Sequence, residues 1–234
     1  MSYNFTQNIV FDLNTIPYFL AFCLYIRIFL YLGYTFLKLT NNKFYLLNKD
    51  RKQYVVKNIV KSINLGALSL YSIPCIIYPA FMYQTWNNKL MHIAGLFYSS
   101  NDFVALLYVD NLSSTTKNHH KVTVVLSFLA LGIDYTTSTL GRMLFIYTLA
   151  SSYAFLVNYY LGSRFLYDKY NKSLVNMKKN ARNVYALSLF LNWNWHIYWC
   201  LTNFNLLGIQ HLLYFGVMIP VVKDDIVLLT WLCN

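Results

Sequence analysis

The residues of this sequence best suited to chemistry are two adjacent histidines, His119 and His120, with Thr123 close behind them. On a helix, residues three and four positions apart share a face, so Thr123 would lie beside both imidazoles. Imidazole gains and loses a proton near neutral pH and is the commonest general base in enzymes. The spacing therefore predicts a site where a histidine removes a proton and the threonine hydroxyl donates a hydrogen bond.

Asp102 is the fourth candidate catalytic residue, and it lies inside an apolar run that covers residues 91–109. An acidic side chain in such a run is a functional-site hypothesis by default, and here it could orient one imidazole or hold it charged. The alternative is a polar knot that ties two helices together. Interhelical hydrogen bonds in membranes average about 0.6 kcal/mol, so a knot would favour helix register more than stability. Both interpretations stay open at this point.

The composition indicates that these residues belong to a membrane protein. Hydrophobic residues make up 57% of the chain and charged residues only 12%, whereas soluble domains carry about 25% charged residues. The net charge is +11, and the basic residues cluster in short connectors between apolar segments, as topology-setting loops do. No basic stretch is interleaved with stacking aromatic residues on a polar segment, so membrane lipids rather than nucleic acid are the expected partners.

The apolar runs predict an all-α, polytopic transmembrane bundle of six to seven helices. The seven expected segments cover residues 16–39, 63–83, 91–109, 119–133, 140–161, 184–201 and 206–222. With seven spans, connectors 40–62, 110–118 and 163–183 lie on one side and hold nearly all the loop charge, which satisfies the positive-inside rule. This topology places the histidine pair at the cytoplasmic end of the fourth segment. A six-span bundle, with the first or seventh segment lying flat, is the alternative.

Two local patterns add detail to the expected bundle. Pro74 and Pro79 predict a kink or break in the second segment, because proline lacks the backbone donor that a helix interior needs. The charged run from Lys223 to Asp225 is expected to end the seventh segment. Residues 226–233 would then form a separate apolar piece, too short to cross the membrane, at its interface.

Neither a metal ion nor another cofactor is expected. The four cysteines lie far apart, and of the five histidines only His119 and His120 are adjacent, with no HxxxH spacing. No glycine-rich phosphate loop occurs either.

Four residues outside the histidine site are candidate lipid contacts: Arg27, Trp193, Trp195 and Trp199. Arg27 falls near the middle of the first segment, where an arginine costs about 2.5 to 3.5 kcal/mol, so it should face protein, water or an anionic headgroup. The tryptophans could form a cage for a headgroup cation. Their alternative role is an interfacial belt combined with core packing.

Three stretches carry a family resemblance. The run from Asn118 to Thr123 matches a paired-histidine motif, HHxxT, at the head of a membrane helix. Residues 95–102 are similar to a glycine-to-aspartate stretch on the preceding helix, and residues 149–158 resemble a serine-pair and asparagine segment. On these residues the chain resembles a degenerate member of the TLC-domain family, which includes ceramide synthases and smaller lipid-regulating proteins. The likeness covers about residues 57–213.

The resemblance implies a layout, a location and a class of ligand. Residues 1–56 would be an N-terminal transmembrane helix with a basic connector, residues 57–222 the TLC-like domain, and residues 223–234 a short tail. The chain would bind or modify acyl or sphingolipid-type lipids, with acyl-CoA as a candidate substrate. An endoplasmic-reticulum-like endomembrane is implied for this integral, multi-pass protein, with the mitochondrial inner membrane and a virion membrane as alternatives.

The chain departs from the family pattern at two places. Asn64 stands where members often have a histidine, and residues 145–153 lack the histidine and aspartate that ceramide synthases carry. The resemblance therefore implies the fold more strongly than acyl transfer, and whether the chain is an enzyme stays open. The alternative function is a non-catalytic structural or accessory subunit of a larger membrane complex, with other membrane subunits as partners.

Overall fold

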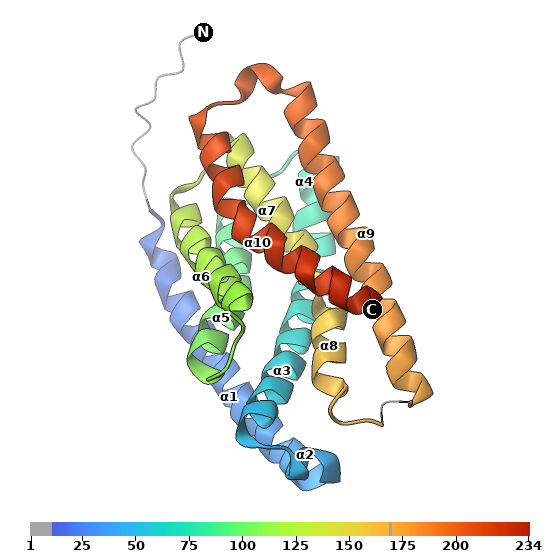
Figure 1. The fold of residues 1–234 in the computed structure, drawn as a ribbon. Coiled ribbons are helices and arrows are strands. Elements are labelled where there is room, and N and C mark those ends of the chain that lie inside the picture. Colours follow the sequence, from blue (N-terminus) through green and yellow to red (C-terminus); the bar gives the residue numbers. More distant parts are fainter. Residues whose placement is uncertain (1–10, 169) are drawn as a thin grey trace.

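The computed structural model describes residues 11–168 and 170–234, and these residues form an all-helical protein. Helix accounts for 85% of the structure, and the described residues contain no strand. The helices, shown in Figure 1, are α1 (Ile16–Thr40), α2 (Asn42–Leu46), α3 (Lys49–Ser72), α4 (Tyr78–Met82), α5 (Asn88–Tyr108), α6 (Ser114–Leu129), α7 (Thr139–Ser152), α8 (Phe155–Ser163), α9 (Lys172–Thr202) and α10 (Ile209–Cys233). The predicted all-α class is confirmed.

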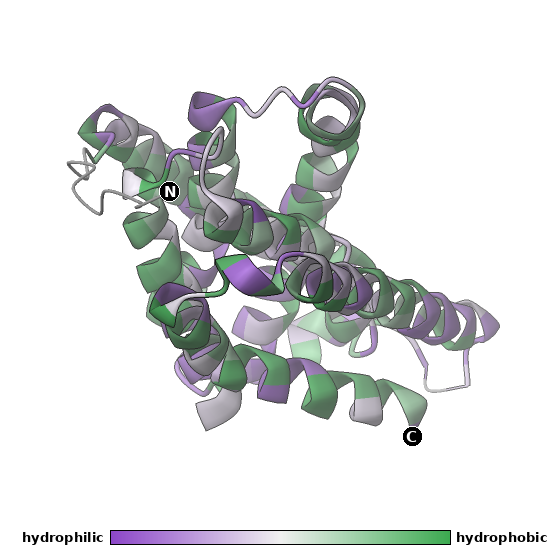
Figure 2. Ribbon diagram, turned by 90° about the horizontal axis from the view of Figure 1, so that it is seen from above, coloured by the Kyte–Doolittle hydropathy of each residue, from purple (hydrophilic) through white to green (hydrophobic). Residues whose placement is uncertain are grey.

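Among the described residues, three stretches of helix are long and apolar enough to cross a membrane: Leu13–Thr40, Lys49–Met82 and Thr139–Ser163. In the first stretch, only 11% of the most apolar 18 residues are buried inside the protein, so most of its apolar side chains face outward. Figure 2 shows hydrophobic residues along most of the helices. An apolar helix that the protein does not cover needs lipid or another chain around it, and this supports a membrane protein.

The helix starts follow local capping signals. Side-chain oxygens of Asn48, Asn87, Ser113 and Ser138 accept hydrogen bonds from backbone N–H groups in the first turns of α3, α5, α6 and α7. Such a cap contributes about 0.5 to 2 kcal/mol to helix stability. Ser113 matters most for the site, because it fixes the N-terminus of the helix that carries both histidines.

The bundle is arranged around α3 and α5. α5 packs against α1, α3, α6 and α7, and α3 packs along α8. The approach of α3 and α8 is close: a Cβ added to Gly162 would lie 2.8 Å from Ile59 Cγ1 and 3.1 Å from the Val55 carbonyl oxygen. α10 runs diagonally across the bundle and packs against α6, α7 and α9 (Figure 1). This crossing brings the end of the chain to the histidine helix.

The expected end of the last helix is wrong. α10 continues through Lys223, Asp224 and Asp225 to Cys233 and does not stop at residue 222. The acidic side chains are tolerated inside the helix because they find partners on other helices. Residues 226–233 are therefore the last turns of α10, with Leu232 only 1% exposed, and are not a separate interfacial piece.

The expected basic connectors are also largely helical. α3 begins at Lys49 and α9 at Lys172, so much of the positive charge predicted for loops lies on helices. Lys169, which belongs to connector 163–183, lies outside the described residues. At Pro74 the regular α-helix is interrupted by a wider helical turn, Ile73–Ile77, but the helix does not break and continues into α4 through Pro79. The fifth expected segment is divided into α7 and α8 by a turn at residues 153–154.

Candidate functional site

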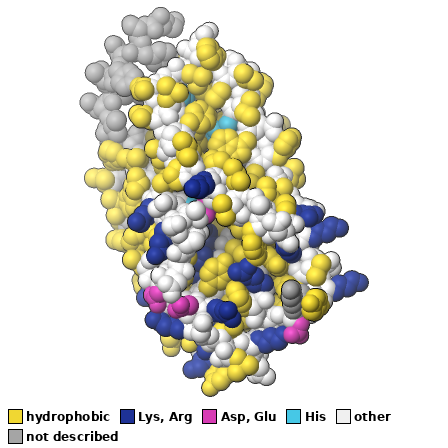
Figure 3. Space-filling model, viewed as in Figure 1, with side chains coloured by type: hydrophobic (Ala, Val, Ile, Leu, Met, Phe, Trp, Pro, Cys, Tyr) yellow, Lys and Arg dark blue, Asp and Glu magenta, His cyan; other side chains and the backbone are white. Residues whose placement is uncertain are grey.

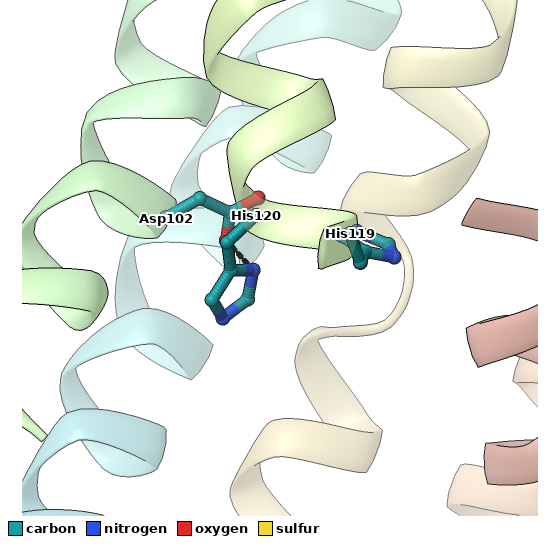
Figure 4. A group of neighbouring side chains, drawn as sticks. All are labelled: Asp102, His119 and His120. Carbon is teal, nitrogen blue, oxygen red and sulfur yellow. Dashed lines mark ion pairs between the residues drawn. The ribbon is translucent and has the colours of Figure 1, made fainter. Parts of the chain in front are cut away.

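Asp102 is the centre of a buried polar group that joins three helices. Its side chain, on α5, has no exposed surface. Lys61 of α3 donates a hydrogen bond from Nζ to Asp102 Oδ1 across 2.5 Å. The Nδ1 atom of His120, on α6, lies 3.0 Å from the same oxygen (Figure 4). The second Asp102 oxygen, Oδ2, is buried and has no hydrogen-bond partner among the described residues.

The two adjacent histidines face different partners. His120 points to Asp102, whereas His119 points away towards α10, as Figure 4 shows. His119 Nδ1 lies 3.4 Å from Asp224 Oδ2, and the two imidazole rings stand at 89° to each other. The paired motif therefore connects α6 to two other helices at once, α5 through His120 and α10 through His119.

Thr123 does not meet the imidazoles with its hydroxyl, so that part of the predicted convergence is wrong. Its Oγ1 donates to the backbone carbonyl oxygen of His119 across 2.9 Å. Threonine on a helix often bonds back to the carbonyl four residues earlier, which competes with any longer-range contact. Thr123 does follow the histidines by one turn on the same helix, but its hydroxyl bonds to the backbone of that helix.

Asp225, the neighbour of Asp224, forms a second buried polar group that involves tyrosines. Tyr185 on α9 donates to Asp225 Oδ1 across 2.7 Å, and Tyr147 on α7 donates to Oδ2. Asp225 is only 6% exposed. Two phenol donors meet the hydrogen-bonding needs of the buried carboxyl group and hold α7, α9 and α10 together at the level of the histidines.

A cavity of about 370 Å³ lies between these helices. Its polar wall includes Lys57, Lys61, His119, His120, Asp224 and Asp225. His120 Nε2 is buried and has no hydrogen-bond partner among the described residues. Buried polar atoms in native proteins are almost always partnered by protein, water or a ligand. The unpartnered nitrogen of this cavity-lining histidine therefore indicates a place where a small molecule or a substrate group can bind.

The same residues offer ligand atoms for a metal ion. One atom each from Asp102, His119 and His120 lies within 4.8 Å of the others. Three protein ligands with an open position are typical of catalytic zinc. However, the Lys61 ammonium already occupies Asp102 Oδ1, so a divalent cation would sit against a fixed positive charge. The donor set therefore fits a metal ion poorly.

Arg27 lies away from the cavity. Its side chain is exposed on α1, and the guanidinium carbon lies 5.8 Å above the ring of Tyr108. Arg27 is not among the residues that line the histidine cavity. Its observed neighbour is an aromatic face, which attracts cations through the ring quadrupole.

The three tryptophans pack around two other histidines. The ring centroids of Trp193 and Trp195 lie 5.2 Å and 5.5 Å from the ring centroid of His196. Trp199 stacks on His211 with 5.3 Å between the ring centroids. All three are partly buried and pack against a core cluster that contains Tyr214 and Met218. None of the three lines the cavity beside His119 and His120.

The sequence interpretation missed Lys57, Lys61, Asp224 and Asp225 as parts of the site. Lys57 and Lys61 were assigned to a connector, although their spacing of four is also the spacing of one helix face. Both are buried on α3, with Lys57 7% and Lys61 8% exposed. The sequence also contains a signal for Asp224 and Asp225, because they are adjacent in a chain that has only 8 acidic residues.

Asn64, the residue that departs from the family's histidine, is part of the same buried layer. It donates from Nδ2 to Asn101 Oδ1 across 2.7 Å, which pairs α3 with α5 one turn after Lys61 and directly before Asp102. Comparison of the chain with known proteins finds no matching family model, curated protein or solved structure.

Proposed function

We propose that this chain is an integral membrane protein with a TLC-like bundle of six to seven spans that handles acyl or sphingolipid-type lipids. The observation that carries the proposal is His120 Nε2, a buried and unpartnered nitrogen of a residue that lines a polar cavity. The other ring nitrogen faces Asp102, so the proton is expected on Nδ1 and the lone pair on Nε2. That is the tautomer a general base needs.

Acyl transfer is the reaction that this arrangement supports best. His120 Nε2 would accept the proton of an amine or hydroxyl group as that group attacks the thioester carbonyl of an acyl-CoA. The C–S bond then breaks and the thiolate leaves with the electron pair. Asp102 would stabilise the imidazolium that forms, as the buried carboxylate of a catalytic triad does. Lys61 keeps Asp102 in place through the ion pair on Oδ1.

The outer surface of the bundle supports additional spans. Large hydrophobic side chains are exposed along α9 and α10, for example Phe190 at 63%, Ile197 at 57%, Leu212 at 69% and Ile219 at 66%. Surfaces of this kind are costly in water and favourable in lipid. Figure 3 shows hydrophobic side chains over the upper part of one face and Lys and Arg side chains gathered on the lower part. The separation fits a membrane boundary between the two regions.

The proposal is tested with full-length protein purified in mild detergent. Acyl transfer from a long-chain acyl-CoA to a long-chain amine is measured, and bound lipid is identified by mass spectrometry. His120→Ala and Asp102→Asn are expected to abolish transfer, whereas Thr123→Ala is expected to keep it because its hydroxyl bonds only to a backbone carbonyl. Transfer and bound lipid at the parent level in both site variants would contradict the proposal.

The second candidate function is a non-catalytic subunit of a larger membrane complex. It is favoured by α1, whose outer face exposes Leu24, Tyr31 and Phe36 at 64%, 70% and 64%. A partner helix would cover such a face. This function predicts co-purification with other membrane proteins at fixed stoichiometry, whereas a monodisperse monomer that retains lipid would favour the first function.

A further inference from the structure

Lys57 is a buried lysine that makes no ion pair among the described residues. It is 7% exposed and lines the histidine cavity, one helical turn before Lys61. Among residues 11–168 and 170–234 it makes no ion pair and donates no hydrogen bond, and its observed neighbour is the ring of Tyr54 at 5.4 Å. Lys61, by contrast, is neutralised by Asp102. A buried ammonium is costly unless it is paired, so an anion bound beside Lys57 would stabilise its charged form.

Arg164 is a second unpaired cation on the same cavity wall. It follows α8, and its guanidinium lies 5.7 Å from the Tyr54 ring and 4.7 Å from the Trp231 ring. Its Nε is buried and has no hydrogen-bond partner among the described residues. Lys57 and Arg164 thus share the aromatic ring of Tyr54, and neither makes an ion pair with a carboxylate among the described residues.

The N-terminus of α6 adds to this positive environment. Ser113, Thr115 and Thr116 line the cavity where this 16-residue helix begins. Backbone N–H groups at a helix N-terminus and the helix dipole favour anions. The acidic residues of the cavity have partners of their own: Asp224 meets His119 and accepts a hydrogen bond from Thr116 at the start of α6, and Asp225 meets Tyr147 and Tyr185.

We propose that the cavity binds the phosphate group of an amphiphile between Lys57, Arg164 and the start of α6. This rests on the lipid-handling function and names its substrate class, a hydrocarbon chain that carries a phosphate. A phosphate monoester has about −1.5 to −2 charges near neutral pH, which matches two unpaired cations. The guanidinium fork of Arg164 suits bidentate contact with phosphate oxygens. The bound headgroup would lie in the same cavity as His120 Nε2.

The test is binding of defined amphiphiles to the full-length protein in mild detergent. Tryptophan emission follows titration with dodecyl phosphate, with the uncharged octaethylene glycol dodecyl ether, and with inorganic phosphate alone. The variants are Lys57→Gln and Arg164→Gln. Lys52→Gln is the matched control, because Lys52 is on the same helix and contacts the Tyr45 ring at 5.5 Å but does not line the cavity.

Dodecyl phosphate is expected to bind the parent protein at least about tenfold more tightly than the uncharged ether does, and each cavity variant is expected to lose about tenfold, as for one charged hydrogen bond. Lys57→Arg, which keeps the charge, and the Lys52 control should bind like the parent. If Lys57→Gln does not fold, the proposal is tested by dodecyl phosphate binding to Arg164→Gln and Lys57→Arg.

Three results would overturn the proposal in different ways. Equal binding of the uncharged ether would remove the phosphate site and leave lipid handling intact. Equal binding of inorganic phosphate would show a free-anion site that needs no hydrocarbon chain. Binding of neither amphiphile would overturn both the phosphate site and the lipid-handling function on which it rests.

Discussion

His120 and His196 are both almost completely buried, at 3% and 1% exposure, yet they lie in very different surroundings. His196, among the tryptophans, uses both ring nitrogens: Nδ1 lies 2.8 Å from the Asn192 carbonyl oxygen and Nε2 lies 3.1 Å from the Tyr214 hydroxyl. His120 has one nitrogen beside Asp102 and leaves Nε2 without a partner. The first histidine is fully satisfied by the protein, whereas the second lines a cavity and has a ring nitrogen without a hydrogen-bond partner among the described residues.

The comparison separates a structural histidine from a candidate chemical one by what each nitrogen contacts. Burial alone does not distinguish them. The aromatic region around His196 is filled by side chains that pack on each other, whereas the region around His120 contains charges and empty volume. Buried charges and unpaired polar atoms are costly, and proteins retain them mainly where binding or catalysis needs them.

The most direct way to break this comparison is to change each histidine to glutamine. His120→Gln is expected to lower acyl transfer by about 10²- to 10⁴-fold, the usual contribution of a general base, with little loss of stability. His196→Gln is expected to keep transfer but to lower the free energy of unfolding by about 1 to 3 kcal/mol, because the Tyr214 hydroxyl loses its partner. Transfer assays and thermal unfolding in detergent measure the two effects. Reversed effects would show that the tryptophan region is the functional one.

A second prediction concerns the charges that only the His120 region buries. Asp102→Ala leaves Lys61 buried without a counterion, and breaking such a pair typically costs about 3 to 5 kcal/mol. The double variant Asp102→Ala/Lys61→Met is expected to recover much of that loss, because no unpaired charge remains. Thermal unfolding of the parent, the single variant and the double variant measures this loss and its recovery. A double variant no more stable than the single one would mean that packing, not charge, dominates at this position.

The two regions also differ in how far the sequence could predict them. The helix positions were predictable because apolar runs, prolines and capping residues are local signals. The closeness of Asp102 and His120 was an expectation from motif order, and the structure brings them together. Lys61 and Asp224 were not predicted, because their partners lie 41 and 105 residues away in the sequence. Contacts between distant helices depend on packing angles that no local pattern encodes.

A smaller effect is expected where α3 meets α8, the contact that positions Lys57 and Arg164. Gly162→Ala would place a Cβ 2.8 Å from Ile59 Cγ1 and 3.1 Å from a backbone oxygen of Val55. Overpacking of this kind costs about 1 to 3 kcal/mol. Gly95→Ala is the control, because nothing lies within 4 Å of its added Cβ. Thermal unfolding is expected to show a loss for the first variant only, together with weaker dodecyl phosphate binding. Equal behaviour of the two variants would contradict the close packing.

The smallest predicted effect concerns Asp134, an exposed carboxylate that contrasts with the buried Asp102. Hydrogen bonds from Asn88 and Thr136 lower the pKa of Asp134 from 3.8 to about 2. Because the pKa is lower in the folded protein, the carboxylate stabilises the fold above its ordinary pKa, and this contribution is lost as the pH falls through about 2. Solvent screening limits the gain at an exposed site to less than about 1 kcal/mol. Asp134→Asn should therefore flatten the stability profile between about pH 4 and pH 2. Thr136→Val should flatten it partly, since it removes one of the donors. Unfolding measured across this range tests both variants, and profiles parallel to that of the parent protein would show that these hydrogen bonds do not hold the loop.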